Sequence, residues 1–358
     1  MSRNGNLALG VGGVIRMRGY FDWNGSIPTS GFSPYFITIP KDPTHDRSIS
    51  ANPSGTALYF TLLGHNSIFG DYLGYIEAGF SGYNNRDFKL KKAYIQVGDW
   101  TAGYATTTFE DTKAEPSTID GAGANGKNTR TNVLVRYLHT FKGNHWSVAG
   151  SFEFPSSSID ADGTYTRACA DYVPDIAAFA QYQWDGGSSH IRISGLGRVL
   201  TYRNLLAEKN QDIFGWAAQL SGVVKVLPQL NIYGIASIGQ GHESYTTDLV
   251  GGSFDLIAKP GQVGELYAPT AAGYVFGASY YFSPKLFSNL ALSEQRYYPR
   301  QNPDNSQYKY GLYGAINLFY DVTPRFEIGA EYLVGKRMNF DGTHGNANRV
   351  TAMMMLSF

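Results

Sequence analysis

The stretch GLYGAINLFYDVTPRFEIGAEYLVGKR, residues 311–337, decides the fold because it reads as two strands joined by a tight turn. Before the turn, apolar side chains at every second position alternate with small or polar ones, and the alternation resumes after it. A period of two gives each strand one apolar face and one polar face. Residues 321–324 provide the turn, with Pro324 where a missing N–H costs little. The hairpin therefore predicts a sheet that is apolar on one face only.

The composition fits an amphipathic sheet. The chain has 42 Gly, 26 Tyr and 21 Phe, only 16% charged residues, and no run approaching the roughly 18 apolar residues of a membrane-spanning helix. Helix-bundle membrane proteins are thereby excluded. The 29 basic and 29 acidic residues balance, which gives no argument for a nucleic-acid partner. One cysteine, Cys169, and seven scattered histidines give no support for a disulfide within the chain, a metal site or a cofactor.

Sixteen segments repeat the alternation of the hairpin. Their expected ranges are 13–23, 55–65, 72–82, 89–97, 101–107, 129–141, 145–154, 174–184, 189–203, 213–226, 230–241, 273–282, 286–298, 308–320, 325–336 and 348–358. The number is even, as it must be in a closed antiparallel sheet whose two chain ends lie on one side.

Short and long connections alternate between these segments. The short ones are expected at 67–71, 98–99, 142–144, 185–187, 227–229, 283–285 and 321–324. The longer, polar ones are expected at 24–54, 108–128, 155–173, 242–272 and 338–347, and near Asn84, Asn204 and Arg300. This pattern predicts an all-β fold, a sixteen-stranded antiparallel transmembrane β-barrel over residues 13–358, with residues 1–12 as an N-terminal tail. Because such a barrel must be exported, we expect Met1 to begin a mature form without its signal peptide.

Aromatic residues gather at the segment ends, which predicts the two aromatic girdles of an outer-membrane barrel. Examples are Tyr20, Phe21, Trp23, Phe152, Phe154, Tyr182, Trp184, Tyr280, Tyr281, Phe282, Tyr297 and Tyr298. The last segment also ends on an aromatic residue, Phe358, a frequent feature of such barrels. A soluble β-sandwich is the alternative, but strands of ten or more residues exceed its usual length.

The alternation places charged side chains inside the barrel, because an Arg or Lys on the lipid face costs about 2–4 kcal/mol near the midplane. The residues expected to line the pore are Arg16, Arg18, Glu77, Lys92, Arg130, Arg136, Arg192, Arg198, Glu327 and Glu331. The basic residues outnumber the acidic ones, which favours anions as permeants. The alternative is that these charges are merely solvated and paired in a wet interior.

The long connection at 108–128 is expected to fold inward, because sixteen strands enclose more room than side chains can fill. Its charged residues are Glu110, Asp111, Lys113, Glu115, Asp120 and Lys127. The alternative is an outward surface loop. The G-x-G-x-x-G at 121–126 lacks a following helix, so it is a chance match to a nucleotide-binding motif and indicates flexibility.

Several stretches, in order along the chain, resemble the DcaP-like family of trimeric, sixteen-stranded outer-membrane porins. They are TTTFEDTKAEPSTIDGAG (106–123), SFEFPSSS (151–158), SHIRISGLGRVLTYR (189–203), GWAAQLSGVVKV (215–226) and GAEYLVGKRMNFDGTHGNANRV (329–350). The resemblance implies a homotrimer, an inward third loop and passive uptake of small anions such as dicarboxylates. It also implies pore positions for Arg198, Arg203 and Arg349, with Phe109, Glu110 and Asp111 opening the inward loop.

Two features depart from the family pattern. The N-terminal coiled-coil extension that the family often carries has no expected counterpart before Gly13, and Ala177 and Ala178 stand where an arginine is expected.

Together these observations predict a diffusion porin of the outer membrane. It would be embedded among outer-membrane lipids and lipopolysaccharide and would pass small hydrophilic solutes without catalysis. A barrel enzyme is one alternative, but the sequence has no G-x-S-x-G and no local catalytic constellation. A soluble all-β binding protein is the other.

Overall fold

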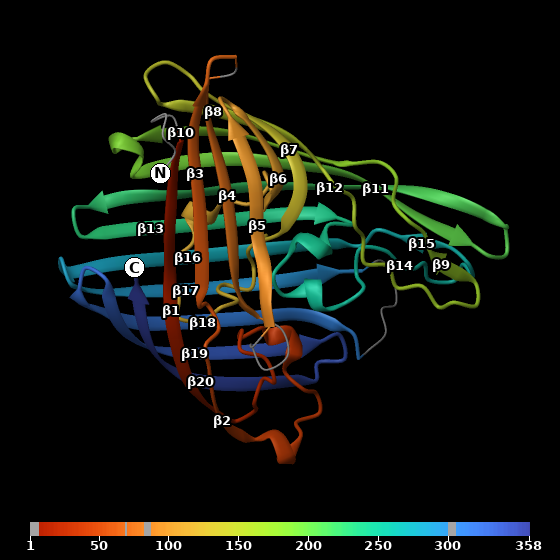
Figure 1. The fold of residues 1–358 in the computed structure, drawn as a ribbon. Helices are drawn as coiled ribbons and strands as arrows, with labels where there is room; N and C mark the ends of the chain where they lie inside the picture. Colours follow the sequence, from red (N-terminus) through yellow and green to blue (C-terminus); the bar gives the residue numbers. More distant parts are fainter. Residues whose placement is uncertain (1–6, 69, 82–86, 300–305) are drawn as a thin grey trace.

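The computed structural model describes residues 7–68, 70–81, 87–299 and 306–358, and these form one closed β-barrel (Figure 1). The described residues form sixteen antiparallel wall strands, which confirms the predicted fold. The strands are β1 (Leu7–Trp23), β3 (Ala57–Asn66), β4 (Gly70–Ser81), β5 (Asp87–Val97), β6 (Trp100–Thr106), β7 (Thr131–Thr140), β8 (Trp146–Glu153), β10 (Asp175–Trp184), β11 (Ser189–Asn204), β12 (Lys209–Leu227), β13 (Leu230–Gln240), β16 (Thr270–Ser283), β17 (Leu286–Tyr298), β18 (Tyr308–Thr323), β19 (Phe326–Asn339) and β20 (His344–Ser357).

The remaining elements are short and belong mostly to the long loops. They are the strands β2 (Arg47–Asn52), β9 (Thr166–Ala168), β14 (Ile257–Ala258) and β15 (Leu266–Tyr267), and the 3-10 turns η1 (Pro34–Phe36), η2 (Pro43–His45), η4 (Thr112–Ala114), η5 (Asp185–Gly187), η6 (Glu243–Tyr245) and η7 (Leu249–Gly251). In the part of the chain that the structure describes, no helix is long and apolar enough to cross a membrane.

Strand β1 closes the barrel by pairing with a different neighbour through each of its halves. Its first half, 7–14, pairs with β3, and its second half, 14–23, pairs with β20. The strand thus begins at Leu7, so the described residues 7–12 belong to the wall and were wrongly assigned to a tail. The adjacent Gly12 and Gly13 interrupt the apolar alternation at this point, which hid the start of the strand from the sequence.

The two faces of the wall differ as the alternation predicts. On β18, Ile316 and Leu318 point outward and are 52% and 48% exposed, whereas Asn317 between them is 4% exposed on the inside. Glu331 on the neighbouring β19 is likewise buried inside. An exposed apolar exterior around a polar interior is the arrangement that a bilayer requires of a barrel.

Short turns follow β3, β5, β7, β10, β12, β16 and β18, and the longer loops lie at the opposite end of the barrel. The turn expected at 321–324 is tighter in the structure, because β18 continues to Thr323 and β19 begins at Phe326, with a register shift after Asp321. The loops expected near Asn84 and Arg300 lie outside the described residues.

The outward position of Ile316, midway along the apolar face of β18, leads to a stability prediction. We expect Ile316→Arg to lower the free energy of unfolding by about 2–4 kcal/mol, because it places a guanidinium in the hydrocarbon layer. The measurement is urea-induced unfolding from lipid vesicles, followed by tryptophan fluorescence. Val322→Arg, on the same strand near its turn, is the control and should cost about 0–1 kcal/mol. Equal losses for both variants would contradict the membrane assignment of this face.

Candidate functional site

The loop between β6 and β7 lies inside the barrel, as the sequence predicts. Phe109, at its start, is fully buried and packs against Ala177 of β10, Leu196 of β11 and Ala217 of β12. Ala177 is a position where an arginine was expected from the family pattern. Its small side chain leaves the space that the Phe109 ring occupies, so the departure is explained by packing.

Farther along, the loop is fastened to the strands that it crosses. The Asp111 carboxylate lies 2.8 Å from Nε2 of His190 on β11 and accepts a hydrogen bond of 2.7 Å from the hydroxyl of Ser221 on β12. Arg192 of β11 donates to the backbone carbonyl of Glu110. These contacts fix the loop to the wall before it reaches the middle of the barrel.

The tip of the loop docks on β19 through a single carboxylate. Glu331 accepts hydrogen bonds from the backbone N–H groups of Ile119 and Asp120, at 2.8 and 2.7 Å. Arg16 and Arg18 of β1 donate to the carbonyl oxygen of Ile119, at 3.0 and 2.9 Å. The peptide groups at the tip are therefore satisfied by side chains of two strands, β19 and β1, and the arginine hydrogen bonds carry a charge, which makes them stronger than neutral ones.

The returning half of the loop lies flat against β16 to β18. Asn125 donates to the carbonyl of Gly311 and accepts from Ser293. A Cβ at Gly126 would lie 2.5 Å from the carbonyl oxygens of Tyr274 and Glu294, so only glycine fits there. Close approach, rather than the flexibility inferred from sequence, explains this glycine of the 121–126 motif.

Within the described residues, the hydrogen bonds that tie this loop to the wall reach β8, β11, β12, β17, β18, β19 and β1, and none reaches β3, β4 or β5. The inner face of these three strands carries Glu77 and Lys92, both predicted to line the pore. Lys113, on the loop, is exposed. The loop's hydrogen bonds thus lie on one side of the interior, which we call the covered half, and they leave the side of β3 to β5, which we call the open half.

Two of the arginines expected to line the pore are fully buried in ion pairs instead, so this part of the prediction was wrong. Arg198 pairs with Asp175 at 3.1 Å and with Asp255 at 3.3 Å. Arg349 holds Asp22 with two hydrogen bonds of 2.6 and 2.9 Å. Both point inward, but they fasten the long loops over the barrel mouth.

Other predicted positions also differ in their surroundings. Arg203 has the opposite parity to Arg198 on β11, so it lies on the outer face and was wrongly placed in the pore.

Arg130 donates to Ser244 and to the Ser156 carbonyl beside the Tyr245 ring. Lys127 and Glu115 pair with each other at 2.6 Å within the loop. Arg136 faces inward and donates to the Thr106 carbonyl at 3.4 Å.

Sequence reasoning missed Lys91, which strict alternation places on the lipid side. The ladder between β4 and β5 shifts register next to Glu77, so Lys91 is an extra residue, and its ammonium lies 4.0 Å from the Glu77 carboxylate. The signal that could have revealed this bulge was the lysine itself, since it would be costly on the lipid face.

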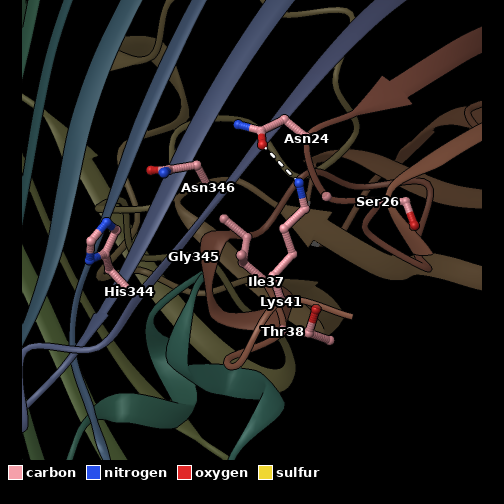
Figure 2. A pocket seen from close by; sticks show the side chains of 9 residues that line it. Asn24, Ser26, Ile37, Thr38, Lys41, His344, Gly345 and Asn346 are labelled. Carbon is pink, nitrogen blue, oxygen red and sulfur yellow. Dashed lines mark hydrogen bonds between the residues drawn. The ribbon is translucent and has the colours of Figure 1, made fainter. Parts of the chain in front are cut away.

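A small pocket lies between the long loop after β1 and the start of β20 (Figure 2). Asn24, Lys41 and Asn346 are among its lining residues. The Lys41 ammonium donates to Asn24 at 3.0 Å and pairs with Asp46 at 2.5 Å. Its charge is thus already neutralised, so we place the functional site in the channel and not in this pocket.

Comparison with known proteins agrees with this geometry. Residues 6–149 match the family model described as DcaP outer membrane protein. The resemblance to the DcaP family is confirmed. The chain has a TM-score of 0.84 with the outer membrane channel DcaP of Acinetobacter baumannii, at 22% identity over 100% of this chain and 99% of that one. No curated protein sequence matches the chain.

More distant porins share the fold. An anion-selective porin from Comamonas acidovorans gives a TM-score of 0.61 at 10% identity, covering 98% of this chain and 100% of that chain. OmpT of Vibrio cholerae in its trimer form gives 0.57 at 9% identity, covering 99% and 100%. These matches show the porin fold. Together with the family model, they place the chain in the outer membrane and support a channel and not an enzyme.

The docking of the loop tip leads to a prediction about conductance. We expect Glu331→Ala to release the tip, because two buried N–H groups lose their acceptor at about 1–3 kcal/mol each. Single-channel recordings should show a larger and noisier conductance. Glu327→Ala, four residues earlier on the same face of β19, removes an equal charge and should leave the conductance noise unchanged. A quiet Glu331→Ala channel of unchanged conductance would show that other contacts hold the tip.

Burial raises the pKa of Glu110, at the root of the loop, to about 7, and the nearby Glu115 acts in the same direction. Its pKa in the unfolded chain is about 4.3. Between these values the folded state binds a proton that the unfolded state lacks, so this contribution to stability is complete below about pH 4 and is lost as pH rises to 7.

We therefore expect Glu110→Gln to match the wild type at pH 4 and to exceed it at pH 8 by about 1–3 kcal/mol in free energy of unfolding. Urea unfolding in detergent micelles at the two pH values measures this difference. Glu208→Gln, at an exposed turn residue, is the control and should show no such difference between the two pH values. A Glu110→Gln variant that is less stable than wild type at pH 8 would contradict the assignment.

Proposed function

We propose that this chain is a diffusion porin, a water-filled channel for passive uptake of small hydrophilic solutes that favours small anions such as dicarboxylates. The observation that carries the proposal is the division of the interior. A docked loop covers one half, and a charged inner face on β3 to β5 remains beside it. A fixed loop narrows the barrel to a size at which the charges along the wall influence the permeant.

The charges around the open half support a modest anion preference. Arg16 and Arg18 lie beside the carboxylates of Glu331 and Asp120, which offset them. Lys91 and Lys92 share the single carboxylate of Glu77. Among the described residues, neither Lys113 nor Arg136 has a carboxylate within ion-pair distance. The net charge around the open half is therefore positive, though smaller than a count of inward arginines alone suggests.

The likeness to trimeric porins supports a homotrimer. OmpT of Vibrio cholerae is described in a trimer form, and the Comamonas acidovorans porin is described as anion-selective. We carry both properties to this chain as parts of the proposal. The broad exposed apolar exterior described above is what a neighbouring protomer or lipid would cover.

An outward-facing pair of arginines supports contact with lipopolysaccharide. Arg203 on β11 lies directly opposite Arg167 on β9, and like charges in opposed positions destabilise a sheet. In the described part of the chain, neither has a carboxylate within ion-pair distance. Phosphate groups of the outer leaflet are suitable partners for such a pair.

Reversal potentials in planar bilayers test the proposed selectivity. In a potassium chloride gradient, we expect chloride to permeate modestly better than potassium, and added mono- and dicarboxylates to carry measurable current. The excess of positive charge around the open half of the interior is the physical reason. A clear preference for potassium would refute the anion preference, while a channel that conducts at all would still be a porin.

A further inference from the structure

We propose that Lys91 and Lys92 form a carboxylate-binding subsite in the channel, in which Glu77 is a built-in competitor that a permeating carboxylate displaces. The inference deepens the proposed function and rests on it. It concerns how the channel discriminates among solutes. In this proposal, Glu77 on β4 and Lys91 and Lys92 on β5 discriminate among them.

The subsite depends on a β-bulge. Glu77 of β4 stands opposite Lys92 of β5, but the next residue, Ala78, stands opposite Leu90, so Lys91 has no partner across the ladder. Bulges of this kind redirect a side chain without breaking the sheet. As a result, two consecutive lysines approach one carboxylate, with Nζ–Oε distances of 4.0 Å for Lys91 and 3.9 Å for Lys92.

The pair is arranged for exchange. Both distances exceed those of a charge-assisted hydrogen bond, about 2.7–2.9 Å, so neither lysine is locked to Glu77. The lysine side chains are 35% and 37% exposed, whereas the Glu77 side chain is 16% exposed. Two ammonium groups and one carboxylate leave a surplus of one positive charge that a solute carboxylate can neutralise.

Tyr75 provides an alternative partner for the displaced glutamate. Its hydroxyl donates to Glu77 at 3.2 Å, and its ring lies 5.2 Å from that of Tyr94 on the next strand. When a solute occupies the lysines, Glu77 keeps this hydrogen bond and stays solvated. Replacing one carboxylate by another is close to neutral in free energy, and weak binding of this kind lets a permeant both enter and leave.

The subsite is open to the lumen. Within the described residues, the inward loop makes no hydrogen bond to β4 or β5. Its hydrogen bonds to the wall reach β1, β8, β11, β12 and β17 to β19. A solute that passes between the loop and the open wall therefore meets the two lysines, with the exposed Lys113 on the loop side.

The decisive variant is Glu77→Gln, studied in planar bilayers with sodium acetate as the probe. We expect the ratio of acetate to sodium permeability to rise about fivefold, the factor for losing one charge interaction across about 4 Å of water. The acetate concentration that gives half-maximal conductance should fall by a similar factor. Glu327→Gln removes an equal charge from the lumen away from the lysines and should change both values by less than half as much.

Lysine variants make the test independent of the glutamate. Lys91→Gln and Lys92→Gln should each abolish the saturation of acetate conductance, and all variants should keep the heat-modifiable gel mobility of a folded barrel. Equal effects of the two glutamate variants, or saturation that survives Lys91→Gln, would overturn the subsite. A wild-type channel that prefers sodium would refute the proposed anion preference instead, whereas an unchanged half-saturation in Glu77→Gln would refute the subsite whichever ion the wild type prefers.

Discussion

The tip of the inward loop is held in the middle of the barrel by one carboxylate that binds two peptide groups. Glu331 accepts both N–H groups at the tip of the inward loop, while Arg16 and Arg18 hold the carbonyl oxygen between them. A carboxylate buried without such partners would be strongly unfavourable. Here its hydrogen bonds offset the loss of water and hold a long polar loop across a wide barrel. The loop then divides the interior into a covered half and an open half.

The inward arginines fall into two groups with different roles. Arginines of the first group are paired with a nearby carboxylate, and those of the second group are not. Arg198 binds two buried aspartates and Arg349 binds one, and both also donate to loop carbonyls, so they stabilise the barrel mouth. The aspartates neutralise the charge of these arginines, which therefore adds little to the electrostatic field in the pore. Arg136 faces inward without such a partner in the described residues. A count of arginines per barrel is therefore a poor measure of selectivity in this fold.

Much of the fold could be predicted because a bilayer imposes a period of two on every strand. The same constraint correctly separated Ile316 from Asn317 and indicated which loop has room to enter the barrel. It could not reveal the partners of the arginines, since Asp22 and Arg349 are 327 residues apart in sequence. Nor could it locate the bulge at Lys91. One extra residue reverses the alternation of inward and outward side chains along the strand, and it leaves no other mark in the sequence. The packing of Phe109 against Ala177 likewise depends on a contact between distant segments.

Strand β1 has a consequence for how the protein is assembled. Because its second half pairs with β20, the cylinder stays open along one side until β20 docks, and Gly13 and Phe358 then exchange two backbone hydrogen bonds. Contacts between chain ends so distant in sequence form slowly, since their loop-closure entropy is large. Until then the sheet has two unpaired edges that can associate with other chains. An unfinished barrel therefore carries a risk of aggregation that the closed barrel does not.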